Sequence, residues 1–358
     1  MKPFAVKIFA LLIVLAVPSF SLAAVSPDLL HVYESRADLQ SAFSGPTYQA
    51  LPETAAGFLI DLEDWARQYG WKAYPELEEY APDVAPVLPL RRGGSQTLPY
   101  DPPPVSSLHY IIIDDASGEI LAAQNADVSW PIASLTKLMT VKTAFESGID
   151  PYGLGSVETS DEVGGARLGV TPGTTFTLRD LLYATIVGSA NNAANAVARE
   201  TGLTTLAFVE RMNTNAAIMN LSRTHFVDPT GIELGNVSTA RETAFFAREA
   251  FAQENIRRMT GTSIAQIAAL NDVTYVRDLK NTNWLLYDSA YDDVYVTAGK
   301  TGYLDESQWN LVVRMHPMGE SENKSVLIVL MGASGRRESF DDAHILAHWA
   351  WDNFDWER

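Results

Sequence analysis

The sequence predicts an α+β fold built on an antiparallel sheet whose first and last strands pair with each other. Apolar, strand-like runs occupy residues 108–114, 119–124, 295–303, 309–315 and 325–331. Helical patterns fill most of the long interval between the early and late runs, and one more helix, 340–351, follows the last strand. Strands and helices are therefore segregated along the chain rather than alternating, which favours α+β over a parallel βαβ sheet.

The first two strands are predicted to form a hairpin, because the sequence Asp-Ala-Ser-Gly at 115–118 separates them. The next element is a helix, indicated by apolar residues at helical spacing from Leu135 to Phe145. Gly148 is expected to end it, since glycine readily adopts the left-handed conformation that closes many helices.

Two further helices are expected before the late strands. The sequence Thr177-Leu178-Arg179-Asp180 has the spacing of a capping box, so a helix should begin there and run to about Val187. Another covers residues 192–200 and should end at Gly202.

Composition excludes several classes of protein. The chain has 358 residues, of which 47% are hydrophobic and 20% charged, as in ordinary globular proteins rather than disordered chains or polytopic membrane proteins. Its 44 acidic and 26 basic residues give a net charge of −18, and such a surface repels phosphate backbones and anionic lipids. No nucleic-acid partner is expected. Cysteine is absent, which excludes disulfides, thiolate zinc sites and a cysteine nucleophile.

Residues 1–23 are predicted to be a signal peptide. Lys2 and Lys7 precede or flank an unbroken apolar run at 8–17, and small residues around Ala23 offer cleavage before Ala24 or Val25. The run is too short to span a bilayer, which takes about 20 apolar residues, so an uncleaved anchor is the weaker alternative. We expect an exported protein, periplasmic or otherwise extracytoplasmic.

Residues 24–104 are predicted to be a proline-rich appendage and linker. Between residues 25 and 104 lie 11 of the 18 prolines, including the run at 102–104, and this composition disfavours long helices. Residues 105–358 are predicted to be the compact catalytic domain.

The sequence Ser134-Leu135-Thr136-Lys137 is the first candidate for chemistry. The spacing of three places the Ser134 hydroxyl and the Lys137 amine on one face of the predicted helix. A neutral lysine can act as the base that turns a serine into a nucleophile, and burial or a second cation would lower the lysine pKa. Alone the motif is loose: a capping serine and a solvated lysine satisfy it equally, as Ser321-Glu322-Asn323-Lys324 is expected to do in a solvated loop.

Two more motifs follow in order. Ser189-Ala190-Asn191 lies at a break between two predicted helices, where a loop can present a hydroxyl and an amide to a cleft. Lys300-Thr301-Gly302 lies within a predicted strand after Gly299, and glycine inside a strand often marks close approach of a ligand. A cation and a hydroxyl there could bind a carboxylate. The ordered triple is far more specific than any of its parts.

Metal chemistry is not expected. His344 and His348 lie four residues apart on the last predicted helix, but Ile345 occupies the position at which a zinc peptidase of the His-Glu-x-x-His type carries its glutamate. Two ordinary helix histidines are the better interpretation. No Gly-x-Ser-x-Gly elbow is present either, so an α/β-hydrolase is unsupported.

The ordered triple resembles the motif set of the serine penicillin-binding proteins and β-lactamases. The resemblance covers about residue 108 to the C-terminus and is strongest to the low-molecular-mass D-alanyl-D-alanine carboxypeptidases and endopeptidases. The blocks 226–231, 236–240 and 281–284 are similar to the endopeptidase branch. The resemblance implies a serine β-lactamase/DD-peptidase-like fold, an antiparallel sheet flanked by helices with a helical subdomain.

The resemblance also implies roles. Ser134 would attack the carbonyl of the penultimate D-alanine of a peptidoglycan stem peptide and form an acyl-enzyme, with Lys137 as general base. Ser189 would relay a proton to the leaving amine, and Asn191 would hold the substrate amide and the Lys137 head. Substrate binding would fall to the strand residues: Lys300, Thr301 and Gly302 at the carboxylate, and the Tyr303 N–H with that of Ser134 in the oxyanion hole. No cofactor is implied, and β-lactams would inhibit.

Alternatives remain open at this point. A serine β-lactamase is disfavoured because Glu233-Leu234-Gly235-Asn236 only faintly matches the loop that carries the deacylating glutamate of class A enzymes. Two further alternatives are a catalytically silent wall-binding scaffold protein and a protein whose proline-rich appendage recruits a partner while the enzyme is secondary. The sequence does not choose between carboxypeptidase and endopeptidase. The acidic tail, with Trp349, Trp351 and Trp356 expected to pack the last helix, predicts no stable membrane anchor after signal cleavage.

Overall fold

The structure, a computed structural model, describes residues 90–91 and 101–356. The predicted signal peptide and most of the predicted proline-rich appendage lie outside the described residues. Where the appendage is described, β1 (Leu90–Arg91) pairs with β13 (Phe354–Asp355) near the end of the chain.

A five-stranded antiparallel sheet forms the centre of the molecule, in the order β10-β11-β12-β2-β3. Its strands are β2 (His109–Asp114), β3 (Ile120–Gln124), β10 (Val294–Leu304), β11 (Gln308–Pro317) and β12 (Val326–Ala333). The last strand pairs with the first, with Val329 opposite Ile111, as the sequence predicts. The predicted hairpin turn is also confirmed, since Gly118 has a φ of 77° and its N–H donates to the Asp114 carbonyl at 2.8 Å.

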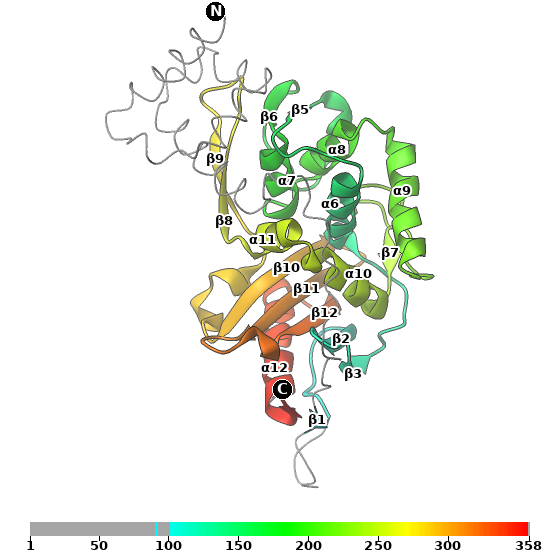
Figure 1. The fold of residues 1–358 in the computed structure, drawn as a ribbon, viewed down its shortest axis with the longest axis vertical. Helices are drawn as coiled ribbons and strands as arrows, with labels where there is room; N and C mark the ends of the chain where they lie inside the picture. The colour runs from blue at the N-terminus through cyan, green and yellow to red at the C-terminus, as the bar shows by residue number, and fades with distance from the viewer. Residues whose placement is uncertain (1–89, 92–100, 357–358) are drawn as a thin grey trace, which may run out of the picture.

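Both faces of this sheet are buried. Successive side chains of a strand point to opposite faces, and Ile111 and Ile113 of β2 belong to one core whereas Tyr110 and Ile112 belong to another. The second core is closed by α12 (Arg336–Asn353), and α10 (Ala240–Ala252) and α11 (Glu254–Gly261) contact the sheet on the side of the first. In Figure 1 α12 (red) lies on the side of the sheet away from the green helices.

A helical subdomain stands against one end of the sheet and extends the first core (Figure 1). It contains α6 (Thr136–Glu146), α7 (Leu178–Ile186), α8 (Asn191–Glu200) and α9 (Thr205–Ile218). The central helix is α6, which contacts the other three and buries most of its residues. The predicted helix ends are confirmed: Thr177 caps α7 by accepting the Asp180 N–H at 3.1 Å, and Gly148 and Gly202 have φ of 81° and 79°.

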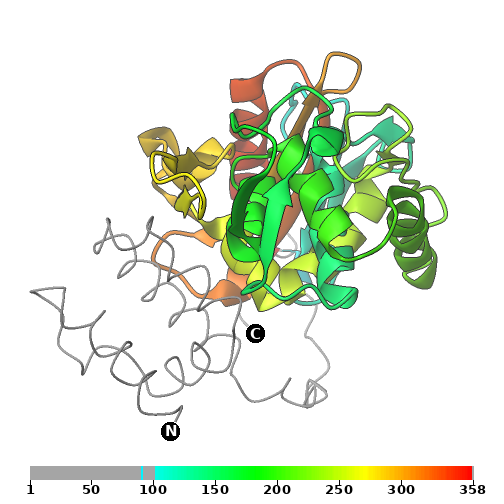
Figure 2. The ribbon, with the colours of Figure 1, turned by 90° about the horizontal axis from the view of Figure 1, so that it is seen from above.

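Further short pairs of strands lie outside the central sheet. They are β4 (Trp130–Pro131) with β7 (Val237–Ser238), β5 (Leu154–Val157) with β6 (Thr174–Thr177), and β8 (Ile264–Ala268) with β9 (Val276–Lys280). The sequence did not predict them, because strands of two to five residues are too short for a clear period of two. In Figure 2 the yellow segment that contains β8 and β9 stands at one side of the helical subdomain.

The late part of the chain agrees with the sequence interpretation. Trp349, Trp351 and Trp356 are buried in the core beneath α12. The second Ser-x-x-Lys sequence forms the exposed connection between β11 and β12 around the short helix η6 (Glu322–Lys324). Over residues 90–91 and 101–356, none of the helices combines the length and the apolar character that crossing a bilayer demands.

Candidate active site

Ser134 lies in a strained turn, the short helix η2 (Ala133–Leu135), immediately before α6. The residue before it, Ala133, is buried and has a φ of 50°, a left-handed conformation that costs a residue other than glycine about 1–3 kcal/mol. Such strain persists only where the surrounding structure enforces it. The turn places the Ser134 Oγ 2.8 Å from the Nζ of Lys137 on the first turn of α6, as the spacing predicts.

The Lys137 amine is wholly buried and is held by three oxygen atoms. Besides the Ser134 hydroxyl, its Nζ lies 2.7 Å from the Asn191 Oδ1 and 2.6 Å from the Thr230 carbonyl oxygen. Burial lowers the pKa of Lys137 well below its usual range, the positive charge of Lys300 lowers it further, and the carboxylate of Asp228 opposes both. The geometry therefore joins a hydroxyl to an amine that loses its proton easily.

The Thr230 carbonyl reaches Lys137 because a tight loop is folded around Asp228. The Asp228 carboxylate accepts from the N–H groups of Thr230, Gly231 and Glu233, the Thr230 hydroxyl and the Asn236 amide. Gly231 has a φ of +81°, and a Cβ there would lie 1.9 Å from the Ala133 carbonyl oxygen. The loop therefore lies directly against the nucleophile turn. The sequence had marked this block only by resemblance and gave it no role.

We expect Asp228→Ala to lower kcat/KM by about 10²-fold, the cost of misplacing a reacting group by about 1 Å. Asp228→Asn keeps one acceptor oxygen for the loop but removes the charge that raises the Lys137 pKa. The rise of kcat/KM with pH that reports deprotonation of Lys137 should therefore move to lower pH, because Lys137 then loses its proton at a lower pH. Initial rates across pH on a D-Ala-D-Ala peptide check both, with thermal unfolding measured alongside. A folded Asp228→Ala variant with wild-type rates would contradict the positioning role.

The loop between α7 and α8 carries the second motif into the same site. Ser189 also has a left-handed backbone, with a φ of 54°, and its Oγ accepts from the Lys300 Nζ at 2.9 Å. Asn191 begins α8, and while its Oδ1 faces Lys137 its Nδ2 donates to the Gly164 carbonyl at 2.8 Å. Asn191 thus fixes the lysine amine to the wall of the helical subdomain.

The third motif lies on β10, at the edge of the sheet that faces the nucleophile turn. Lys300 is buried, and its Nζ also donates to the Thr301 carbonyl at 2.9 Å. Burial, and secondarily the charge of Arg336, lowers the pKa of Lys300 to about 7. A Cβ at Gly302 would lie 2.8 Å from the Ile132 carbonyl oxygen and 3.1 Å from the Ser134 N, so glycine is required for this close approach. Tyr303 follows, half-exposed, with its ring 4.2 Å from that of Trp309.

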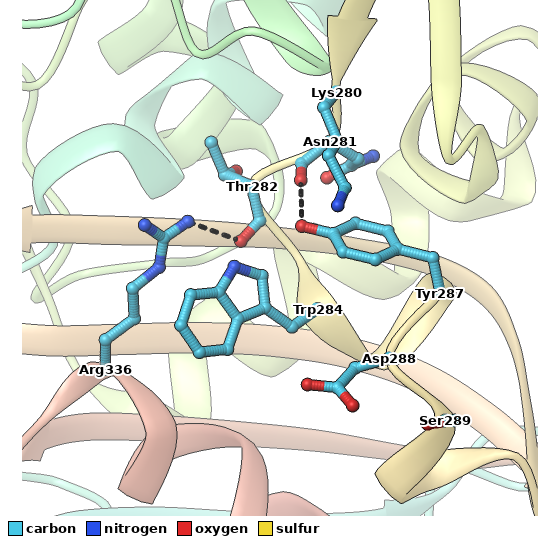
Figure 3. Close-up of a pocket in the computed structure, with 8 residues that line it drawn as sticks. All are labelled: Lys280, Asn281, Thr282, Trp284, Tyr287, Asp288, Ser289 and Arg336. Carbon is cyan, nitrogen blue, oxygen red and sulfur yellow. Dashed lines mark hydrogen bonds between the residues drawn. The ribbon is translucent and has the colours of Figure 1, made fainter.

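The structure adds Thr282 and Arg336, which the sequence did not assign. The Thr282 Oγ1 lies 2.6 Å from the Thr301 Oγ1, and the Thr282 carbonyl accepts from the Arg336 Nη2 at 3.1 Å (Figure 3). The guanidinium lies 4.7 Å from the Trp284 ring centre, and among the described residues its buried Nε has no hydrogen-bond partner. Only the block 281–284 gave a signal, and only through resemblance. Arg336 gave none, because it reaches the site from α12.

One group among the described residues has the donors for a metal ion. The Nε2 atoms of His344 and His348 lie 2.8 and 2.9 Å from the two carboxylate oxygens of Asp293, the residue before β10. The sequence had considered the histidine pair but not the aspartate. The contacts of both rings with Asp293 account for the arrangement, and the chemistry of the serine–lysine site does not involve this group.

Comparison with known proteins identifies the family. Residues 96–335 match the model of the Peptidase_S11 family, described as D-alanyl-D-alanine carboxypeptidase. The chain belongs to this family. It is 30% identical over 242 residues to the D-alanyl-D-alanine endopeptidase of Pseudomonas aeruginosa, covering 67% of this chain and 75% of the relative. The endopeptidase of Haemophilus influenzae is 29% identical over 233 residues, 64% of this chain and 78% of the relative.

The solved structures agree on the fold. A D-alanyl-D-alanine carboxypeptidase from Mycobacterium tuberculosis superposes with a TM-score of 0.64 at 24% identity, covering 74% of this chain and 96% of that one. The predicted fold class, family and enzyme class are therefore confirmed: this S11 chain is a serine-type D-alanyl-D-alanine peptidase with an α+β fold.

Proposed function

We propose that this S11 peptidase cleaves peptidoglycan stem peptides, or the cross-links between them, through an acyl-enzyme on Ser134. The observation that carries the proposal is the wholly buried Lys137 amine, held 2.8 Å from the Ser134 Oγ and supported by Asn191 and Thr230. A buried amine with a lowered pKa can be neutral and accept the hydroxyl proton.

The proposed reaction transfers the acyl group of the substrate first to Ser134 and then to water. The Ser134 Oγ attacks the carbonyl of the penultimate D-alanine while Lys137 takes its proton, and the N–H groups of Ser134 and Tyr303 bind the oxyanion. The carbon–nitrogen bond then breaks, and the proton that Lys137 took passes through the Ser189 hydroxyl to the leaving amine, which returns Lys137 to its neutral form. Water attacks the ester in the second half, with Lys137 again as base, and returns the free serine.

Substrate binding is assigned to the β10 edge and its neighbours. Lys300 and Thr301 would hold the carboxylate of the leaving residue, with Gly302 keeping the strand close to Ser134, and Asn191 would hold the substrate amide. Arg336 would add a second cation to the carboxylate site. Its buried Nε is a donor without a hydrogen-bond partner among the described residues, and its charge is close enough to lower the pKa of Lys300. Arginine suits carboxylates because its donors form a planar fork.

The same serine would be acylated by β-lactams, and the adduct should last. Rapid loss of the adduct would need a second, carboxylate base to activate water beside Lys137, yet all five hydrogen bonds described for the Asp228 carboxylate come from its own loop. The nearby Glu233 side chain is exposed. These observations support a peptidase over a β-lactamase. The substrate class and the predicted signal peptide together support an extracytoplasmic enzyme.

The proposal is tested by incubating the chain with two substrates, a stem peptide ending in D-Ala-D-Ala and a cross-linked peptide dimer, and separating the products by mass spectrometry. Release of D-alanine from the first, or of two stem peptides from the second, is the expected result. A chain that cleaves neither, although it is folded, would be a silent binding protein and the proposed activity would be wrong.

A further inference from the structure

We propose that the pocket beside Thr282 and Arg336 binds the leaving half of a peptide cross-link, so that the enzyme recognises both stem peptides and acts as an endopeptidase. This inference rests on the proposed function. The pocket has a volume of about 620 Å³ and is lined mainly by residues 280–289, with Arg336 of α12 closing one side (Figure 3).

Its position assigns the pocket to the leaving side of the scissile bond. The acyl carbon must sit at the Ser134 Oγ, and the carboxylate of the leaving residue lies one residue further, at Lys300 and Thr301. The Thr301 hydroxyl is hydrogen-bonded to the Thr282 hydroxyl at 2.6 Å, and Thr282 and Arg336 both line the pocket. The pocket therefore begins where the leaving residue's carboxylate is bound. Asn191, which would hold the amide of the acyl half, does not line the pocket and is hydrogen-bonded to the Gly164 carbonyl of the helical subdomain.

The volume exceeds what a carboxypeptidase requires. Its leaving group is a single D-alanine, which presents only a methyl group beyond the carboxylate. Pockets of about 300–1,000 Å³ are typical of small-molecule ligands, and this one falls within that range. A cross-link fills such a space, because its leaving amine belongs to the side chain of a diamino acid that continues into a whole second stem peptide.

The lining has the chemistry for that arm. Trp284 and Tyr287 offer aromatic faces against which an aliphatic side chain can pack (Figure 3). Lys280 is exposed at the pocket with its Nζ 3.9 Å from the Tyr287 ring centre, which places a cation where carboxylates of the second stem peptide would pass. Acidic residues outnumber basic ones in the chain, 44 to 26, but the pocket lining has the opposite balance. It contains two cations, Lys280 and Arg336, and one acid, Asp288.

Lys280 provides the sharpest test, because it is exposed and has no part in the catalytic machinery. Lys280→Gln should lower kcat/KM for a soluble cross-linked peptide dimer by about 10-fold, and Lys280→Glu by more, since a charge-assisted contact is first lost and then reversed. Both variants should hydrolyse a single stem peptide ending in D-Ala-D-Ala, and react with benzylpenicillin, at rates within about twofold of wild type. Arg277→Gln is the matched control. Arg277 lies on β9, as Lys280 does, and its guanidinium also lies over a tyrosine ring, that of Tyr275, but Arg277 does not line the pocket.

The outcomes separate the subsite from the activity itself. Equal losses on both substrates would mean that Lys280 acts through the carboxylate subsite, and no loss on the dimer would mean that the pocket does not bind the leaving half; either overturns the inference. A wild-type chain that cleaves the single peptide but not the dimer overturns the inference and leaves the proposed peptidase intact. A wild-type chain that cleaves neither overturns the proposed function first.

Discussion

Ser134→Ala should abolish the covalent adduct that benzylpenicillin is expected to form with the wild-type chain. It should also lower peptidase turnover by roughly 10⁴-fold or more, as loss of a nucleophile does in other acyl-transfer enzymes. The expectation follows from the structure around the hydroxyl. Its Oγ is the hydroxyl among the three oxygen atoms that hold the buried Lys137 amine, and alanine removes that atom with little change in volume. Intact mass measured against time after adding penicillin checks the result.

The chain provides its own control for this experiment. Ser321 belongs to the second Ser-x-x-Lys sequence, and its hydroxyl only caps the exposed helix η6 by accepting the Asn323 N–H. Ser321→Ala should keep the full adduct. An adduct that persists in Ser134→Ala would contradict the assignment. A wild-type adduct that vanishes within seconds would favour a β-lactamase, and a wild type that never forms one would favour the silent scaffold.

The contrast between these two serines explains how much of the site could be predicted. Sequence alone distinguishes them by context, since one precedes an apolar helix and the other lies between two strands. The sequence predicted the following site residues, which the structure brings together: Ser134, Lys137, Ser189, Asn191 and the β10 residues 300–302. Tyr303, also predicted, follows them on β10, where its side chain contacts Asp305 and Trp309. Each lies in a local motif whose spacing is fixed by one helix turn or one strand, so the chemistry is visible without the fold.

The site residues that the sequence did not predict make contacts with residues far from them along the chain. The Thr230 carbonyl, which reaches Lys137, is a backbone atom that any residue could supply, and only the folded loop around Asp228 identifies it. Arg336 reaches Thr282 across 54 residues of sequence. The fold was predictable where strands are long and apolar. The short pairs β4–β7, β5–β6 and β8–β9 were not, because their pairing is decided by tertiary contacts rather than by a periodic pattern.

Lys137→Met tests the second half of the nucleophile pair and should leave Ser134 present but unreactive. Methionine fills a similar volume without an amine, so the hydroxyl loses its base, and general-base catalysis is worth about 10²–10⁴-fold. We expect acylation by benzylpenicillin and hydrolysis of a D-Ala-D-Ala peptide to slow together by this factor. Lys142→Met, on the same helix but paired with Glu146 at the surface, is the matched control and should retain the wild-type rate.

The two buried lysines must have opposite protonation states in the active enzyme, and the expected pH profile of the wild type follows from this. Lys137 works only when neutral, so kcat/KM should rise with pH through its pKa, which burial and the nearby Lys300 hold well below the usual 10.5. Lys300 binds a carboxylate only when charged, so kcat/KM should fall again as pH rises through its pKa of about 7. A bell-shaped profile results whichever pKa is lower, because the two requirements are opposite in sign. In Lys300→Arg the cation stays charged, so the fall of kcat/KM at high pH should move to higher pH. An unchanged basic limb would mean that another group limits substrate binding.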